Sequence, residues 1–210
     1  MRIAIMQPYF APYAGYFRLF DQTDLFVMYD CVQFPRRGWV HRNKMKDRNQ
    51  QLQWVTLPIK KAPRNILIKD LEFAEAPEDF TARFPALQSF DTTKLKGSVA
   101  SYLIGHLQEI TQALNIPFKI VRSSELNISP EYKAQDRILE ICKHLGATSY
   151  LNAPGGKDLY DAQAFEKHNI DLSFLPPYDG NMHSILQEMV EKPVADIRKE
   201  ILYPKISGGD

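Results

Sequence analysis

Two residues of this chain are the first candidates for moving a proton. Asp30 follows the apolar and aromatic run 25–29, and a carboxylate at a strand end can bind a sugar hydroxyl or act as a general base. His183 follows the polar turn 179–181, where an imidazole can also serve as a base. We therefore predict Asp30 and His183 as catalytic residues. A turn-capping aspartate is the structural alternative for Asp30.

A strongly basic segment comes soon after Asp30. From Arg36 to Arg64 the chain holds nine Lys and Arg residues and one acid, Asp47, a formal charge of +8 in a protein of total +1. Arginine suits bidentate recognition of phosphate, and tryptophan can stack on a base or a sugar. The segment predicts an anionic, phosphate-containing small-molecule ligand, although a solvated basic face is the alternative. The predicted ligand-binding residues here are Arg36, Arg37, Trp39, Arg42 and Asn43.

The loop after the first expected strand is rich in tyrosine and proline. Prolines stiffen the path of the backbone, and a glycine lets another group approach closely. In a parallel sheet this loop lies at the carboxyl edge, where ligands usually bind. We therefore predict five more ligand-binding residues: Gln7, Tyr9, Tyr13, Gly15 and Tyr16.

Two later positions could also contact a ligand. Lys157 follows Gly155 and Gly156, whose amides could form an anion nest, with a plain turn as the alternative. Cys31 is either a nucleophile or a small buried side chain. The spacing of His, Cys and carboxylates does not predict a metal site, and the sequence leaves any cofactor unknown.

Short apolar runs that alternate with helical patterns would position these residues. We expect strands at 3–7, 25–30, 118–122, 148–151 and 172–175. This pattern predicts an α/β fold with a Rossmann-like, doubly wound, mainly parallel sheet. The runs 51–59 and 66–73 predict an inserted basic β-hairpin after the second strand, and the pattern from 182 to 202 predicts a helical C-terminus, interrupted at Pro193.

Length and composition favour one globular domain. We expect an α/β domain over residues 1–192, with the hairpin insert at about 36–75, and a C-terminal helix and tail over 193–210. Two cysteines among 210 residues fit the reducing cytoplasm, and no apolar run is long enough to span a bilayer. A net charge of +1 gives no argument for nucleic acid as a partner.

Five short motifs resemble the WbqC-like family of bacteria. Residues 7–17 match its Q-P-x-Y/F-x-P-x-x-G-Y-F motif, and residues 30–34 match D-x-V-Q-F. The other matches are 36–43, which ends in R-N, the W-x-T-x-P element at 54–58, and 150–157. Members of this family occur with surface-polysaccharide biosynthesis. The resemblance therefore implies a transferase acting on a sugar nucleotide or nucleotide-linked amino sugar, in association with other biosynthetic enzymes.

Two other functions stay open. Residues 13–16, Y-A-G-Y, occupy the place of the H-x-G-H motif of class I nucleotidylyl-transfer domains, although both histidines are replaced. That resemblance implies an ATP-dependent nucleotidylyl-transfer or amino-acid-activating enzyme. A non-catalytic nucleotide- or sugar-binding scaffold protein is the third alternative. Binding of sugar nucleotides would favour the first function, and binding of ATP the second.

Overall fold

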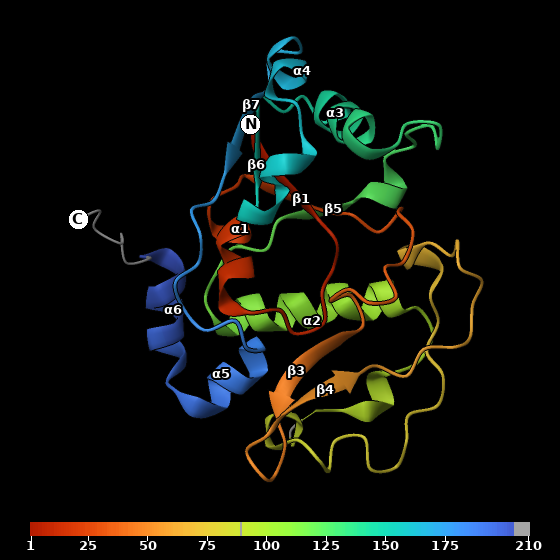
Figure 1. The fold of residues 1–210 in the computed structure, drawn as a ribbon, viewed down its shortest axis with the longest axis vertical. Coiled ribbons are helices and arrows are strands. Elements are labelled where there is room, and N and C mark those ends of the chain that lie inside the picture. Colours follow the sequence, from red (N-terminus) through yellow and green to blue (C-terminus); the bar gives the residue numbers. More distant parts are fainter. Residues whose placement is uncertain (89, 204–210) are drawn as a thin grey trace.

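A five-stranded parallel sheet forms the centre of the computed structural model, which describes residues 1–88 and 90–203 (Figure 1). The strands are β1 (Arg2–Met6), β2 (Leu25–Met28), β5 (Ile120–Arg122), β6 (Ser149–Asn152) and β7 (Asp171–Phe174). Their order is β5-β2-β1-β6-β7, and all four pairings are parallel. The predicted α/β class with a mainly parallel sheet is confirmed.

The strand order reverses next to β1. The chain runs from β1 outward through β2 to β5, and then returns to the other side of β1 for β6 and β7. β1 therefore pairs with both β2 and β6, with Ile3 opposite Leu25 on one side and Tyr150 on the other. Such a reversal leaves a crevice at the carboxyl ends of the two central strands, because the connections leave them in opposite directions.

Helices cover both faces of the sheet because its central strands are apolar on both sides. Ala4 and Phe26 pack in the core that also holds residues of α1, α2 and α6, whereas Ile5 and Val27 pack in a second core with residues of α3 and α4. The helices are α1 (Arg18–Asp21), α2 (Val99–Ala113), α3 (Ala134–His144), α4 (Ala162–Glu166), α5 (Ile185–Glu191) and α6 (Val194–Leu202). Figure 1 shows α3 and α4 in the upper half and α2 crossing below the sheet.

An antiparallel hairpin lies beyond α2, in the lower half of Figure 1. It pairs β3 (Arg42–Lys46) with β4 (Leu52–Thr56). β4 pairs with β3, which precedes it in the chain, so the predicted pairing of 51–59 with 66–73 is reduced to one isolated antiparallel bridge, between Ile59 and Phe73. Residues 66–73 instead contain a 3-10 turn at Ile68–Asp70. The connection of the observed hairpin, residues 47–51, is held by Asp47, whose Oδ1 accepts hydrogen bonds from the amides of Asn49 and Gln51.

The C-terminal part of the described chain consists of α5 and α6. Pro193 stands at the N-terminal end of α6 and separates the two helices. The predicted division after residue 192 stays a prediction, and residues 204–210 of its tail lie outside the described range. Among the helices in the described ranges, none has the length and apolar character needed to cross a bilayer.

Candidate functional site

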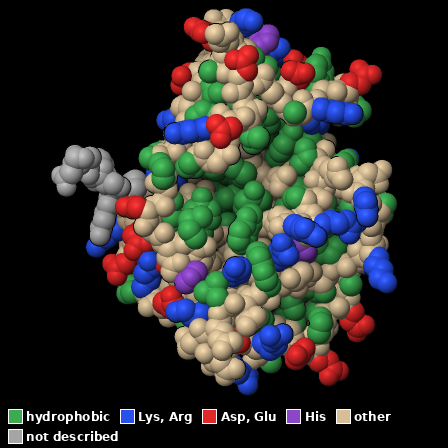
Figure 2. All heavy atoms as spheres, in the orientation of Figure 1, with side chains coloured by type: hydrophobic (Ala, Val, Ile, Leu, Met, Phe, Trp, Pro, Cys, Tyr) green, Lys and Arg blue, Asp and Glu red, His purple; other side chains and the backbone are tan. Residues whose placement is uncertain are grey.

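A cavity of about 430 Å³ opens where the strand order reverses. Met6 at the end of β1, Ala153 just after β6 and Leu175 just after β7 all contribute to its wall. Figure 2 shows hydrophobic side chains gathered in a hollow at the centre of this face, with Lys and Arg side chains along its border. Open α/β sheets bind ligands at this place, and the volume lies in the range of small-molecule sites. We call it the switch-point cavity.

The first loop, residues 7–17, supplies most of the aromatic lining. Tyr9, Tyr13 and Tyr16 line the cavity, and the ring centroids of Tyr9 and Tyr16 are 5.4 Å apart. The Tyr16 hydroxyl donates a hydrogen bond to the Gln7 carbonyl at 2.9 Å, which holds the loop closed on itself. Gly15 also lines the cavity, and a Cβ atom placed there would lie 2.6 Å from Cγ of Tyr178. Space, rather than backbone angle, therefore requires glycine at this position.

The three tyrosines of the first loop are neutral phenols, and burial disfavours their ionisation further. Burial raises the pKa of Tyr9 and of Tyr13, and it raises the pKa of Tyr16 well above the usual value. Neutral phenols can donate hydrogen bonds but are poor bases at physiological pH. Among the described residues that line the cavity there is no Asp, Glu, His, Lys or Arg. The interior is thus suited to an uncharged ring with hydroxyl groups.

Asn43 joins the hairpin to the first loop. This side chain is 2% exposed, and its Nδ2 donates to the carbonyl oxygens of Phe10 at 3.2 Å and Ala11 at 2.6 Å. Ala11 has φ of +43°, a conformation that L residues rarely adopt. The amide of Asn43 therefore holds a strained turn in place, and Asn43 itself lines the cavity.

Two half-exposed tryptophans stand at the mouth of the cavity. Trp39 lines it and is 43% exposed; its ring centroid lies 5.4 Å from that of Trp54, which is 41% exposed. The guanidinium carbon of Arg42 lies 4.2 Å from the Trp54 ring centroid, and Nζ of Lys44 lies 5.2 Å from it. Cation–π contacts of this kind order both cations beside the rings. We call these four residues the rim platform.

The other basic residues predicted to bind a ligand lie outside the cavity lining. Arg36 donates through Nη2 to the carbonyl oxygens of Ala62 at 2.6 Å and Pro63 at 2.9 Å. Arg37 is exposed, and its carbonyl accepts a bond from Arg42. Lys157 is exposed in the 3-10 helix Pro154–Leu159, two residues beyond Gly155 of the lining. The structure thus brings together Tyr9, Tyr13, Gly15, Tyr16, Trp39 and Asn43, with Arg42 beside them, and leaves the Gln7 side chain, Arg36, Arg37 and Lys157 outside the lining.

Asp30 is fully buried at the end of β2, in a hydrogen-bond network outside the cavity lining. Its Oδ2 accepts hydrogen bonds from Nε of Arg122 at 2.8 Å and Oγ of Ser124 at 2.9 Å. Its Oδ1 accepts bonds from Oγ of Ser123 at 3.1 Å and the Ser124 amide at 3.0 Å. These contacts tie β2 to the segment after β5, so they support a structural role. The catalytic role stays a prediction.

His183 is outside the lining of the switch-point cavity and follows Met182, which belongs to it. Its amide donates to Oδ1 of Asn181, and its Nδ1 lies 2.9 Å from Nδ2 of that residue. One side-chain nitrogen or oxygen atom from each of His183, Glu188 and Glu191 lies within 4.8 Å of the others, a spacing at which a metal ion could be held. Lys192 pairs with Glu188 and Lys46 pairs with Glu191. Because lysines already neutralise both carboxylates, the group is explained as ion pairs between α5 and its neighbours.

Sequence reasoning missed Arg18, which lies next to the cavity residue Leu19. Arg18 is only 1% exposed; its Nη1 donates to the Pro176 carbonyl at 3.0 Å, while Nε and Nη2 have no partner in the part of the chain that the structure describes. Burial lowers its pKa. An arginine inside the apolar run F-R-L-F was the available signal. Tyr178 and Met182 of the lining were missed as well, since their place depends on the strand order.

These features define a Rossmann-like α/β protein with an aromatic cavity at the reversal of its strand order. The chain belongs to the WbqC-like protein family, whose profile matches residues 7–93 and 74–183. The predicted family is thereby confirmed. Uncharacterized protein Rv1507c of Mycobacterium tuberculosis is a relative with 26% identity that aligns with 85% of this chain and 83% of its own length. No solved structure matches the chain.

Proposed function

We propose that this protein is a transferase that acts on a nucleotide-linked sugar bound across the switch-point cavity and the rim platform. The observation that carries the proposal is the meeting of three family motifs at one place. The first loop and residues 150–157 both contribute to the lining, and the 36–43 segment supplies Trp39 and Asn43. The setting of the family in surface-polysaccharide biosynthesis, implied by the motif resemblance, agrees with a sugar-nucleotide substrate.

The two parts of the site suit the two parts of such a substrate. The cavity volume of about 430 Å³ is at the lower end for small-molecule sites, so it suits the sugar ring better than the whole nucleotide. Tyrosine rings pack against the C–H faces of a sugar while their hydroxyls bond its oxygens. Outside, Trp39 and Trp54 offer a surface for a base, and Arg42 and Lys44 offer charge for the diphosphate.

Under this proposal, the residue that transfers the proton is outside the lining of the switch-point cavity. His183 follows Met182, which lines the cavity, and its imidazole could accept the proton of an attacking hydroxyl or amine. Asp30 is the alternative base, and its variant is described in the Discussion. The role of the first loop is to bind and orient the sugar, since its phenols stay protonated.

A second candidate function is non-catalytic binding of the same ligand. It is favoured by one observation, the lack of an ionisable acid or base among the described lining residues other than the tyrosines. Under this alternative the protein would bind a nucleotide-linked sugar within a biosynthetic complex and transfer no group. Binding and turnover therefore have to be measured separately.

A thermal-shift panel tests the proposal. A ligand that binds the native state at 100 times its dissociation constant stabilises it by about 2.7 kcal/mol. We expect UDP-, dTDP- or GDP-sugars to raise the melting midpoint more than ATP or acyl-CoA does. A preference for ATP would instead favour nucleotidylyl transfer, and a panel without any shift would overturn the proposed ligand class.

A pair of charge-matched variants makes the panel specific for the rim. Arg42→Gln removes a cation beside Trp54, whereas Arg48→Gln removes one in the turn of the same hairpin. We expect the shift with sugar nucleotides to fall in Arg42→Gln and to persist in Arg48→Gln. A separate assay then follows consumption of the sugar nucleotide in the presence of a hydroxyl or amine acceptor. Consumption would support the transferase, and binding without consumption would support the non-catalytic protein.

A further inference from the structure

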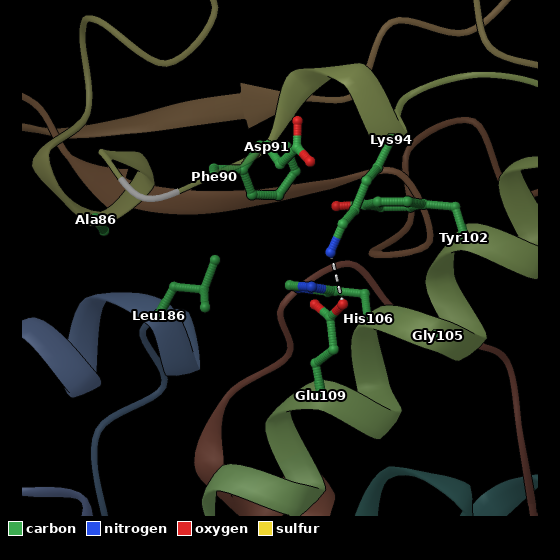
Figure 3. Close-up of a pocket in the computed structure, with 9 residues that line it drawn as sticks. All are labelled: Ala86, Phe90, Asp91, Lys94, Tyr102, Gly105, His106, Glu109 and Leu186. Carbon is green, nitrogen blue, oxygen red and sulfur yellow. Dashed lines mark hydrogen bonds and ion pairs between the residues drawn. The ribbon is translucent and has the colours of Figure 1, made fainter.

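A second cavity, of about 350 Å³, lies between α2, residues 86–88 and 90–94, and α5. Its lining differs completely from that of the switch-point cavity: Ala86, Phe90, Asp91, Lys94, Tyr102, Gly105, His106, Glu109 and Leu186. Figure 3 shows these side chains around one open space, with His106 between the Tyr102 ring and Glu109. Neither the predicted site nor the proposed function uses any of them.

His106 is a buried polar group without a described partner in this cavity. It is 7% exposed, and its ring centroid lies 5.6 Å from that of Phe10 and 5.8 Å from that of Tyr102. Its Nε2 has no hydrogen-bond partner within residues 1–88 and 90–203. Burial lowers its pKa to about 4, so the ring is neutral at physiological pH. Buried polar atoms normally have a partner, and a bound ligand could supply one here.

The charged groups of the cavity favour a ligand that donates hydrogen bonds. Nζ of Lys94 pairs with Oε1 of Glu109 at 2.8 Å. Oδ1 of Asp91 accepts from the Thr93 amide and hydroxyl. Two carboxylates therefore stand against one ammonium group, and each carboxylate has a second oxygen for a ligand. The remaining lining is apolar or aromatic, chiefly Phe90, Tyr102 and Leu186, and can pack on the C–H face of a ring.

We propose that this second cavity is a binding site for a single sugar ring, with preference for an amino sugar over an acidic one. The aromatic wall would contact the ring face, Asp91 and Glu109 would accept bonds from hydroxyl or ammonium groups, and His106 would bond one hydroxyl. Acidic sugars are disfavoured because the cavity already has an excess of carboxylate. The site is distinct from the one assigned to the nucleotide-linked sugar.

The second cavity is packed against the first loop. Phe10 of that loop contacts His106 and lies 6.1 Å, between ring centroids, from Phe90. The amide of Ile185, the neighbour of Leu186, donates to the Pro12 carbonyl at 2.9 Å. Pro12 lines the switch-point cavity. The residues that line the second cavity and their neighbours therefore pack against the first loop, which lines the switch-point cavity.

Histidine NMR with three simple sugars tests the proposal on the full chain at neutral pH. Glucosamine, glucose and glucuronate are titrated while the imidazole resonances of the five histidines are followed, with His106 identified from His106→Gln. We expect saturable shifts of the His106 signal with glucosamine, weaker binding of glucose, and no effect of glucuronate. Absence of any shift, or glucuronate binding as well as glucosamine, would overturn the proposal.

Two surface variants of opposite charge change serve as the internal control. Glu109→Gln should weaken glucosamine binding about 1.5- to fivefold, the usual range for an exposed ion pair, and Lys94→Gln should strengthen it. Changes in the same direction for both variants would contradict the charge argument. Arg42→Gln should leave glucosamine binding unchanged, so failure of the nucleotide-sugar proposal and failure of this one give different results.

Discussion

Replacing Gly15 with alanine tests whether the wall of the switch-point cavity is as tightly packed as the structure indicates. The added methyl carbon would lie 2.6 Å from Cγ and 2.9 Å from Cβ of Tyr178, and it would also overlap the ring edge of Tyr13. Carbon atoms in contact normally lie about 3.5–4.0 Å apart. The Tyr13 and Tyr178 rings must therefore shift by roughly 1 Å, and both rings line the cavity.

The expected effect follows from the cost of overpacking a buried site. Extra methyl groups in well-packed interiors cost about 1–3 kcal/mol. For a chain of this length each kcal/mol corresponds to about 2–4 °C in melting temperature, so we expect a decrease of about 2–12 °C. Because the displaced rings form the binding wall, affinity for a sugar nucleotide should fall at least about tenfold, or roughly 1.4 kcal/mol.

Gly155→Ala is the matched control in the same cavity. Gly155 also lines it, but a Cβ atom there would meet no heavy atom within 4 Å. We expect this variant to melt and bind like the parent protein in differential scanning fluorimetry and calorimetric titration. A Gly15→Ala protein that melts within 1 °C of the parent, within about 0.5 kcal/mol, and binds equally well would refute the close-packing argument.

Three further perturbations probe the rest of the account. Asp30→Asn should destabilise the protein by about 1–3 kcal/mol in urea unfolding, since it removes the charge of a fully buried carboxylate that pairs with the partly exposed Arg122, while the folded fraction binds ligand normally; lost affinity at unchanged stability would instead restore the catalytic role. Asn43→Ala leaves the Phe10 and Ala11 carbonyls without their donor and should cost about 1–3 kcal/mol, measured in the same way, with weakened ligand binding. The pKa of His106 is lowered to about 4 by burial, so the unfolded chain binds this proton first and stability should fall as the pH drops from about 6.5 toward 4, by up to about 3 kcal/mol. His106→Gln should flatten that slope in urea unfolding at a series of pH values, and an unchanged slope would assign the acid sensitivity to other groups.

The parallel sheet could be predicted because its strands are short apolar runs between turn residues. The hairpin partner could not, because β3 alternates Arg42, Lys44 and Lys46 with inward-facing residues of which one is the polar Asn43. The alternation of a strand was present, but hydrophobicity alone did not show it. A buried asparagine that bonds a distant loop carries no local sequence signal.

The site was predictable to the extent that it is local. The first loop was predicted from its tyrosines, its prolines and Gly15, which all lie within residues 7–17. The part of the lining that includes Gly155 and Tyr178 depends on β6 and β7 lying beside β1, and strand order is not contained in the pattern of any one segment. The density of positive charge alone did not identify which arginines line the cavity. Arg36 lies outside the lining and donates hydrogen bonds to the carbonyls of Ala62 and Pro63.

The most direct test of the central claim is a fluorescence titration with nucleotide-linked sugars. The only two tryptophans of the chain, Trp39 and Trp54, both belong to the rim platform, so intrinsic tryptophan emission reports on this place alone. We predict a saturable change in emission with the sugar nucleotide that raises the melting midpoint, and a weaker apparent affinity in Arg42→Gln. A ligand that stabilises the protein yet leaves the tryptophan emission unchanged at saturation would contradict this prediction.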